Sequence, residues 1–243
     1  MATPPETLAK EKSNYARLCF LLVDIGTQCL RDRFNKIHPP ESLCSNLTIH
    51  HAKLLTLQHR RVIKSDQWVT LFPPAPSSAS SEDFDITLLM ILLRNICGLS
   101  APVTGWDTLP FPADKSVEAD IVRVKHYRNT IFAHAKTASI DDATYNTHWL
   151  AIRETLVRLG GTSYEAAIDN LQTVCLDPQV EERYEGLLEQ WKEDETDIKG
   201  KVMVHILCFK VQKTTFSNSF TVVIGTLTQG VYPFLSTQTA KHW

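Results

Sequence analysis

The sequence predicts an all-α fold, a bundle of helices joined by long loops and followed by a peripheral tail of strand-like composition. Apolar residues recur at helical spacing in most segments between residues 13 and 198, and capping residues, Gly or Pro bound these segments. Residues 199–243 differ, because they are rich in Val, Ile, Thr, Phe and Ser and hold no Asp or Glu. We therefore expect a disordered leader over residues 1–12, a helical domain over residues 13–198, and a strand-like or irregular tail over residues 199–243.

Length and charge limit the classes of function. A chain of 243 residues can bury one substantial core. Its 25 Lys and Arg residues against 27 Asp and Glu residues give a net charge of -2, so no field of the whole chain attracts nucleic acid or an anionic membrane. Any contact with RNA would have to be local. The apolar run from Leu18 to Val23 is too short to cross a bilayer, and we expect no membrane partner.

The cysteines are scattered and form neither a CxxC pair nor a close pattern with histidine. This spacing argues against a zinc site and against a disulfide framework, and it is typical of reduced residues in a cytoplasmic protein. The sequence has no GxxxxGK[ST] motif, so NTPase activity is not predicted. We expect no metal and no cofactor. The six cysteines are Cys19, Cys29, Cys44, Cys97, Cys175 and Cys208.

Three apolar-periodic stretches occupy the first half of the predicted domain, at residues 15–34, 41–63 and 65–72. The first is a broad-faced helix with Ser13 and Asn14 as available N-caps, and His38-Pro39-Pro40 ends it because proline disfavours helix in the residue before it. The second has the weaker pattern of one or two helical segments. The third is a short helix that places Trp68 and Phe72 in the core.

A basic cluster belongs to the second of these stretches and consists of His50, His51, His59, Arg60 and Arg61. Adjacent residues of a helix point about 100° apart, so the first two histidines cannot form the shared i,i+4 pair that a metal ion needs. The cluster therefore predicts a solvated basic face rather than a ligand site.

A low-complexity linker, Pro73 to Ser81, precedes a strongly apolar helix that begins at Asp83 or Asp85 and ends near Gly98. Arg94-Asn95 lies on this helix and could brace a neighbouring site. The loop over residues 99–115 is either a packed lid over the helix pair or a simple connection, and the sequence does not decide between them. Beyond the central helix, further helices are predicted over residues 142–159, 162–174 and 177–191.

The central helix, Val117 to Lys136, carries an unusual polar pattern on its apolar side. Its apolar residues fall within an arc of roughly 140° that must face a core. Arg128 lies inside this arc, and His134 lies at its edge, about 120° away around the helix axis. An uncompensated buried guanidinium costs several kcal/mol, so Arg128 requires partners.

The RNTIFAH heptapeptide of this helix, with FDITLLMILLRNICGL before it and THWLAIRETLVRLGG after it, is similar to the RxxxxxH signature region of HEPN domains. The ordered set, from about Tyr15 to about Trp191, resembles the HEPN module of DAZ-interacting RING-type ubiquitin ligases and related animal multidomain proteins. The resemblance implies a HEPN-like helical bundle. In active members of the family it also implies metal-independent endoribonuclease chemistry, usually with two copies of the motif meeting across a dimer.

Two interpretations of Arg128, Asn129 and His134 remain open. In the catalytic interpretation, the guanidinium stabilises charge on a phosphate, the imidazole moves a proton, and Asn129 positions either group. In the structural interpretation, Arg128 is a buried cation paired with an acid of another helix, such as Asp85 or Asp24. His134 is then a partly exposed cation at a helix end, which the helix dipole favours.

The resemblance favours a HEPN-type RNA- or protein-interaction module in signalling or ubiquitin-linked assemblies. The chain has no paired cysteine array for a RING, so ubiquitin transfer of its own is not predicted. The alternative is a metal-independent HEPN endoribonuclease that uses Arg128 and His134 in a dimeric composite site. The expected partners are RNA, a second copy of the chain, and proteins of multidomain signalling assemblies.

Overall fold

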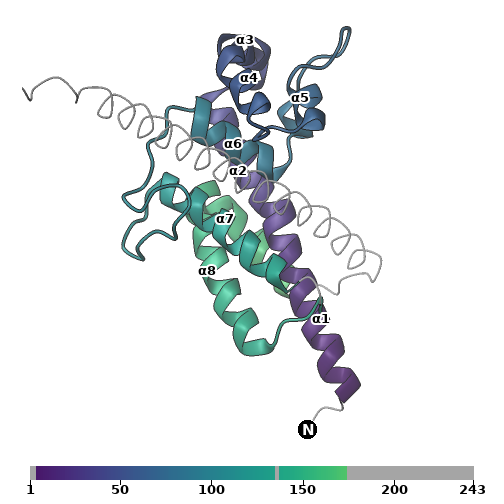
Figure 1. The fold of residues 1–243 in the computed structure, drawn as a ribbon. Helices are drawn as coiled ribbons and strands as arrows, with labels where there is room; N and C mark the ends of the chain where they lie inside the picture. Colours follow the sequence, from purple (N-terminus) through teal and green to yellow (C-terminus); the bar gives the residue numbers. More distant parts are fainter. Residues whose placement is uncertain (1–3, 135–136, 174–243) are drawn as a thin grey trace, which may run out of the picture. The chain divides into compact units, whose positions relative to one another are not determined.

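The computed structural model describes residues 4–134 and 137–173, which all belong to one unit, Met1–Glu193. Every regular element in these residues is helical, which confirms the all-α prediction (Figure 1). The helix predicted over residues 177–191 and the tail predicted over residues 199–243 lie outside the described residues. The elements are α1 (Pro4–Phe20), the π-helix η1 (Leu21–Gly26), α2 (Thr27–Ile37), the 3-10 helix η2 (Pro40–Ser42), α3 (Leu43–Ile49), α4 (His51–His59), α5 (Ser65–Leu71), the 3-10 helix η3 (Ser81–Asp83), α6 (Ile86–Ile96), α7 (Val117–Ala133), α8 (Asp142–Gly160), the 3-10 helix η4 (Thr162–Tyr164) and α9 (Glu165–Thr173).

The first helix begins earlier than the sequence predicts. Residues 4–12, expected to be part of a disordered leader, belong to α1, which starts at Pro4 with Glu6 in its first turn. Proline is well suited to the first turn of a helix, and an acidic residue there is favoured by the dipole. Asn14, expected as an N-cap, is instead buried inside α1, where its Nδ2 donates to the Ile140 carbonyl at 3.1 Å and to Asp142 Oδ1 at 2.8 Å. This side chain ties α1 to the start of α8.

The segments between α2 and α6 match the predicted pattern with one correction. His38 follows the last residue of α2, as the two prolines after it predict, and residues 41–63 form the two short helices α3 and α4. Trp68 and Phe72, expected in the core, are only half-buried, and their rings pack on each other at 4.6 Å. His51 covers both rings, at 5.5 Å and 5.0 Å. Leu71, which is 1 % exposed, is the residue that α5 places in the core.

Helix α8 lies at the centre of the bundle, since it contacts α1, α2, α7 and α9. Helices α7 and α8 lie side by side, as the short connection between them predicts (Figure 1). Their buried residues join those of α1, η1, α2 and α6 in one core that includes Trp149, Phe34 and Leu89. The Asp141 carboxylate caps α8 by accepting the Ala143 and Thr144 N–H groups, each at 3.0 Å.

The loop between α6 and α7 is packed against both helices, which decides the question that its sequence leaves open. The Arg94 guanidinium lies 5.3 Å from the Trp106 ring centroid, and Lys125 Nζ donates to Asp107 Oδ1 at 2.6 Å. Arg123 Nη2 donates to the Phe111 carbonyl at 2.8 Å. Arg94 therefore holds the loop. Its position on α6 had suggested a different role, in which it braces the motif.

The end of α8 approaches α2 so closely that glycine is required at position 160. A Cβ at Gly160 would lie 2.6 Å from Cys29 Sγ and 2.7 Å from the Tyr164 ring. The Tyr164 ring cannot move freely, because its hydroxyl donates to Asp32 Oδ2 at 2.5 Å. At Gly26, by contrast, the nearest atom that a Cβ would meet is the Leu21 carbonyl oxygen at 3.6 Å, which is an ordinary van der Waals contact.

We predict that Gly160→Ala lowers the free energy of unfolding by about 1–3 kcal/mol, since overpacking forces Cys29 and Tyr164 apart. The matched substitution Gly26→Ala should leave the protein as stable or raise its stability by ~0.5–1 kcal/mol, because alanine is the better helix former. Urea unfolding of both variants measures this difference. Equal effects would contradict the close approach.

Candidate functional site

Arg128 is buried in α7 with its hydrogen-bond donors directed to neighbouring polar side chains. The residue is only 8 % exposed. Nη1 donates to Thr87 Oγ1 on α6 at 3.0 Å, while Nε and Nη2 both donate to Asn129 Oδ1, at 3.1 Å and 3.0 Å. The arginine therefore lies inside the bundle, as its place in the apolar arc predicts, and Asn129 orients it.

The partners of Arg128 include one residue that the sequence did not single out, Thr87. Asp85, suggested as an ion-pair partner, caps α6 by accepting the Leu88 N–H at 2.7 Å, and it also accepts from Gln67 Nε2 at 3.1 Å. A threonine two residues after the N-cap of α6 does not by itself predict this contact, because the contact with Arg128 depends on how α6 packs against α7.

His134 follows α7 directly and is half-exposed. Its carbonyl accepts the Thr137 and Ala138 N–H groups at 3.1 Å and 3.0 Å. Helix geometry places it about 9 Å along and about 120° around from Arg128. The two motif residues therefore face different surroundings, the interior for Arg128 and the surface for His134.

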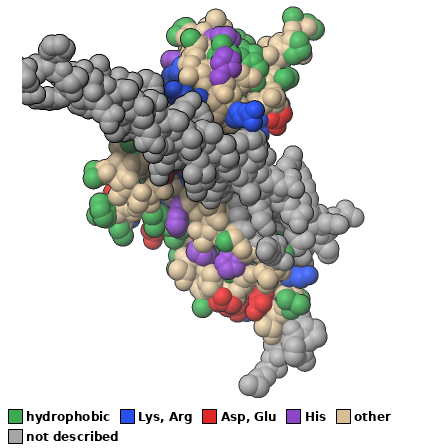
Figure 2. Space-filling view, viewed as in Figure 1, with side chains coloured by type: hydrophobic (Ala, Val, Ile, Leu, Met, Phe, Trp, Pro, Cys, Tyr) green, Lys and Arg blue, Asp and Glu red, His purple; other side chains and the backbone are tan. Residues whose placement is uncertain are grey.

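A second histidine, His148 of α8, is near enough to His134 for the charge of His134 to act on it. It is half-buried, with its ring centroid 6.3 Å from that of Tyr127. Burial lowers the pKa of His148, and the nearby His134 and His126 lower it further. Figure 2 shows histidine side chains gathered on the surface formed by α7 and α8. Across the described part of the chain, no three His, Cys, Asp or Glu side chains are placed to hold a metal ion.

The region that carries the motif is similar to known proteins. A family model described as DZIP3/hRUL138-like HEPN matches residues 40–184, more than half of the chain. The chain belongs to this HEPN family. It is 28 % identical over 149 residues to the E3 ubiquitin-protein ligase DZIP3 of Mus musculus and to that of Homo sapiens. Each match covers 60 % of this chain and 12 % of the relative, so the chain spans only a small part of the ligases' length. No solved structure matches the chain.

The comparisons confirm the resemblance of the RNTIFAH region and its flanks to the HEPN family. The match includes α3 to α9, and therefore the whole of the segment that carries Arg128, Asn129 and His134. The roles of these three residues in catalysis stay a prediction. Among the described helices of this HEPN domain, none is long and apolar enough to cross a membrane.

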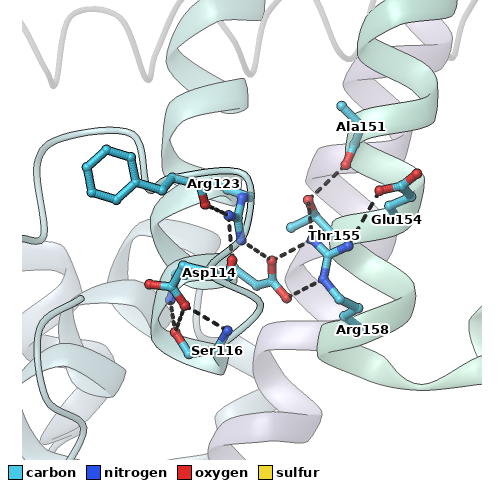
Figure 3. A network of polar contacts seen from close by, with 10 residues as sticks. Asp114, Ser116, Arg123, Ala151, Glu154, Thr155 and Arg158 are labelled. Carbon is cyan, nitrogen blue, oxygen red and sulfur yellow. Dashed lines mark hydrogen bonds and ion pairs between the residues drawn. The ribbon is translucent and has the colours of Figure 1, made fainter. Parts of the chain in front are cut away.

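The position of the motif helix in the HEPN bundle is set by a buried ion network at its other end (Figure 3). Asp120, 1 % exposed, accepts from Arg123 Nη1 at 2.8 Å. It also accepts from Arg158 of α8, through Nε at 2.9 Å and Nη2 at 2.8 Å. Arg123 in turn holds the loop through the carbonyls of Phe111 and Asp114. The network fastens α7 to α8 and to the loop.

Asp120 lies in the first turn of α7, where the helix dipole favours a carboxylate, but this position does not reveal its partners. The i,i+3 spacing of Asp120 and Arg123 does predict that they meet, because residues three apart are neighbours on a helix surface. Arg158 gives no comparable signal, because it reaches Asp120 only through the packing of α8 on α7.

The basic cluster in and around α4 was predicted to be a solvated face, and this is true of part of it. His59, Arg60 and Arg61 are exposed. His50 is half-buried, with its ring centroid 5.9 Å from that of His38, and burial lowers its pKa. Arg61 has a φ of 59°, and its N–H donates to the Gln58 carbonyl at 2.8 Å. It occupies the left-handed position after a helix where glycine is usual.

We predict that Asp120→Asn lowers the free energy of unfolding by about 3–5 kcal/mol, because a buried carboxylate is removed while Arg123 stays buried. The matched control is Asp169→Asn on the surface, where Arg153 Nε donates to Asp169 Oδ1 at 2.7 Å. This exposed pair should contribute little, so the control should unfold with the parent. Urea or thermal unfolding compares the two, and equal losses would contradict a central role for Asp120.

We also predict that acid destabilises this domain through His148. Its pKa is lower in the folded than in the unfolded state, so the unfolded chain binds more protons as the pH falls through the unfolded pKa of about 6.5. The contribution of neutral His148 is complete above that pH and is lost on acidification. His148→Gln should flatten the dependence of the unfolding free energy on pH between about 7.5 and 5.5. An unchanged slope would refute the assignment.

Proposed function

We propose that this HEPN domain is an interaction module of a cytoplasmic, ubiquitin-linked assembly, which binds RNA or protein and does not cut RNA. Its relatives are ubiquitin-protein ligases, and this chain matches only a small part of each of them. A module of this kind would contribute binding to an assembly in which another component transfers ubiquitin.

The single observation that carries this proposal is the engagement of Arg128. A catalytic guanidinium must direct donors at the place where phosphate charge develops. The Arg128 side chain instead directs Nη1 at Thr87, and Nε and Nη2 at Asn129, inside a bundle where the residue is 8 % exposed. To bind a phosphate, the guanidinium would have to leave these partners and turn outward.

The endoribonuclease is the second candidate, and the surroundings of His134 favour it. His134 is half-exposed at the end of α7, and its charge contributes to the lowered pKa of His148 on α8. A neutral imidazole can take a proton from a ribose hydroxyl at neutral pH. In this alternative, a second copy of the chain would complete the site with its own motif.

The deciding experiment incubates labelled single-stranded RNA with the protein in EDTA and follows both binding, by fluorescence anisotropy, and cleavage, by gel. We expect no cleavage by the parent. Arg128→Ala, Arg128→Lys and His134→Ala are assayed beside it, with thermal unfolding as the check that each variant folds. Arg128→Lys retains the charge but not the fork of donors, so it separates loss of charge from loss of geometry.

Each result decides between the functions. Binding of RNA without cleavage supports an RNA-interaction module. If the protein neither binds nor cleaves RNA, the result supports a protein-interaction module. Cleavage by the parent that is lost in folded Arg128→Ala and His134→Ala would replace the proposal with the nuclease. Light scattering then tests the composite site, since a monomeric nuclease could not pair two copies of the motif.

A further inference from the structure

A polar hollow of about 340 Å³ lies between α1, the first turns of α8 and the end of α9. It shares no lining residue with the Arg128 motif or with the Asp120 network. All eight side chains that line it are polar or charged, so it does not suit an apolar ligand. Its volume is at the lower end of the range for small-molecule sites, roughly 300–1,000 Å³.

The charges of the described residues that line the hollow sum to one positive charge. Lys10 and Arg17 of α1 contribute two cations, and Asp142 of α8 contributes one carboxylate. Both oxygens of that carboxylate are already used, since Oδ2 accepts from Lys10 Nζ at 2.5 Å and Oδ1 accepts from Asn14 Nδ2 at 2.8 Å. Arg17 is half-buried, and its Nη1 donates to the Leu171 carbonyl at 2.5 Å. Arg17 is also one of the residues that line the hollow.

Tyr145 provides the observation that points to a ligand. The residue is 6 % exposed and lines the hollow, with its ring packed 5.5 Å from that of Trp149. Its hydroxyl is buried, and it has no hydrogen-bond partner among the described residues. Leaving a buried hydroxyl unsatisfied costs ~1–3 kcal/mol, which an acceptor entering the hollow would recover.

The Tyr145 hydroxyl can donate a hydrogen bond to a ligand at neutral pH. Burial raises its pKa to about 12, and the charge of Arg17 acts in the opposite direction. The hydroxyl therefore keeps its proton at neutral pH. Arg17 and Tyr145 both line the hollow.

We propose that this hollow is a binding site for a small oxyanion, a phosphate or carboxylate group, held by the guanidinium of Arg17 and the hydroxyl of Tyr145. Oxygen anions match both donors, because guanidinium nitrogens bind them in a planar fork and a hydroxyl donates to them strongly. Asn146 and Gln172 line the same hollow with exposed side chains that can donate further hydrogen bonds.

Isothermal titration of the full chain with inorganic phosphate, acetate and adenosine 5′-monophosphate tests the site and identifies the source of the oxyanion. We expect at least one of the three to bind at millimolar concentration or below. Arg17→Gln should weaken this binding at least about tenfold, since charge-assisted hydrogen bonds are lost. Tyr145→Phe should weaken it by roughly tenfold.

Stability separates ligand binding from a structural role of the hydroxyl. Without ligand, Tyr145→Phe removes an unsatisfied polar group, so its melting temperature should equal or exceed that of the parent. The matched control Tyr164→Phe removes a hydroxyl that donates to Asp32, and it should melt lower yet bind the anion normally. The proposal is overturned if none of the three ligands binds, or if binding is unchanged in folded Arg17→Gln and Tyr145→Phe. It also fails if Tyr145→Phe melts as low as Tyr164→Phe. None of these results bears on RNA cleavage.

Discussion

The Asp120 side chain is 1 % exposed and accepts hydrogen bonds from guanidiniums of two helices, Arg123 on α7 and Arg158 on α8. A carboxylate buried in this way is tolerable only because it is fully paired, and the pairing in turn fixes where the helices lie. Arg123 extends the constraint to the loop before α7. Because α7 is held at this end, Arg128, about 12 Å further along the helix, meets Thr87 of α6 rather than solvent.

Burial of Arg128 has a consequence for the kind of function that the domain can support. The same guanidinium that would neutralise a phosphate in a nuclease here joins two helices through side-chain hydrogen bonds. Turning it outward would break its hydrogen bonds to the half-buried Thr87 and Asn129 side chains, which has a cost in free energy. A motif can therefore persist in sequence for a structural reason and still identify the family. The family relationship and the catalytic activity are separate conclusions, and only the first follows from the match over residues 40–184.

Local sequence patterns predicted much of this fold, and pairings between distant residues were the part that they could not supply. The apolar arc of α7 predicted that Arg128 is buried, and the two prolines after His38 predicted the end of α2. Both depend on residues within a few turns. The partners Thr87, Arg158 and His148 come from other helices, and helical periodicity does not say which residues of two packed helices meet. The start of α1 at Pro4 was missed for a related reason, since residues 4–12 lack a broad apolar face and α1 is fastened through Asn14 to the start of α8.

Helix α8 connects the polar features that the domain contains. Tyr145 in its first turns lines the polar hollow, His148 on the next turn has a pKa that responds to the charge of His134, and Arg158 near its end binds Asp120. The other side of α8 is core, where Trp149, Ile152 and Leu156 are at most 2 % exposed. A helix held so firmly by its apolar side keeps its polar residues at fixed positions, which a binding site requires. For the same reason a substitution on the apolar side would disturb all three features together, whereas substitutions at Tyr145, His148 and Arg158 can distinguish them.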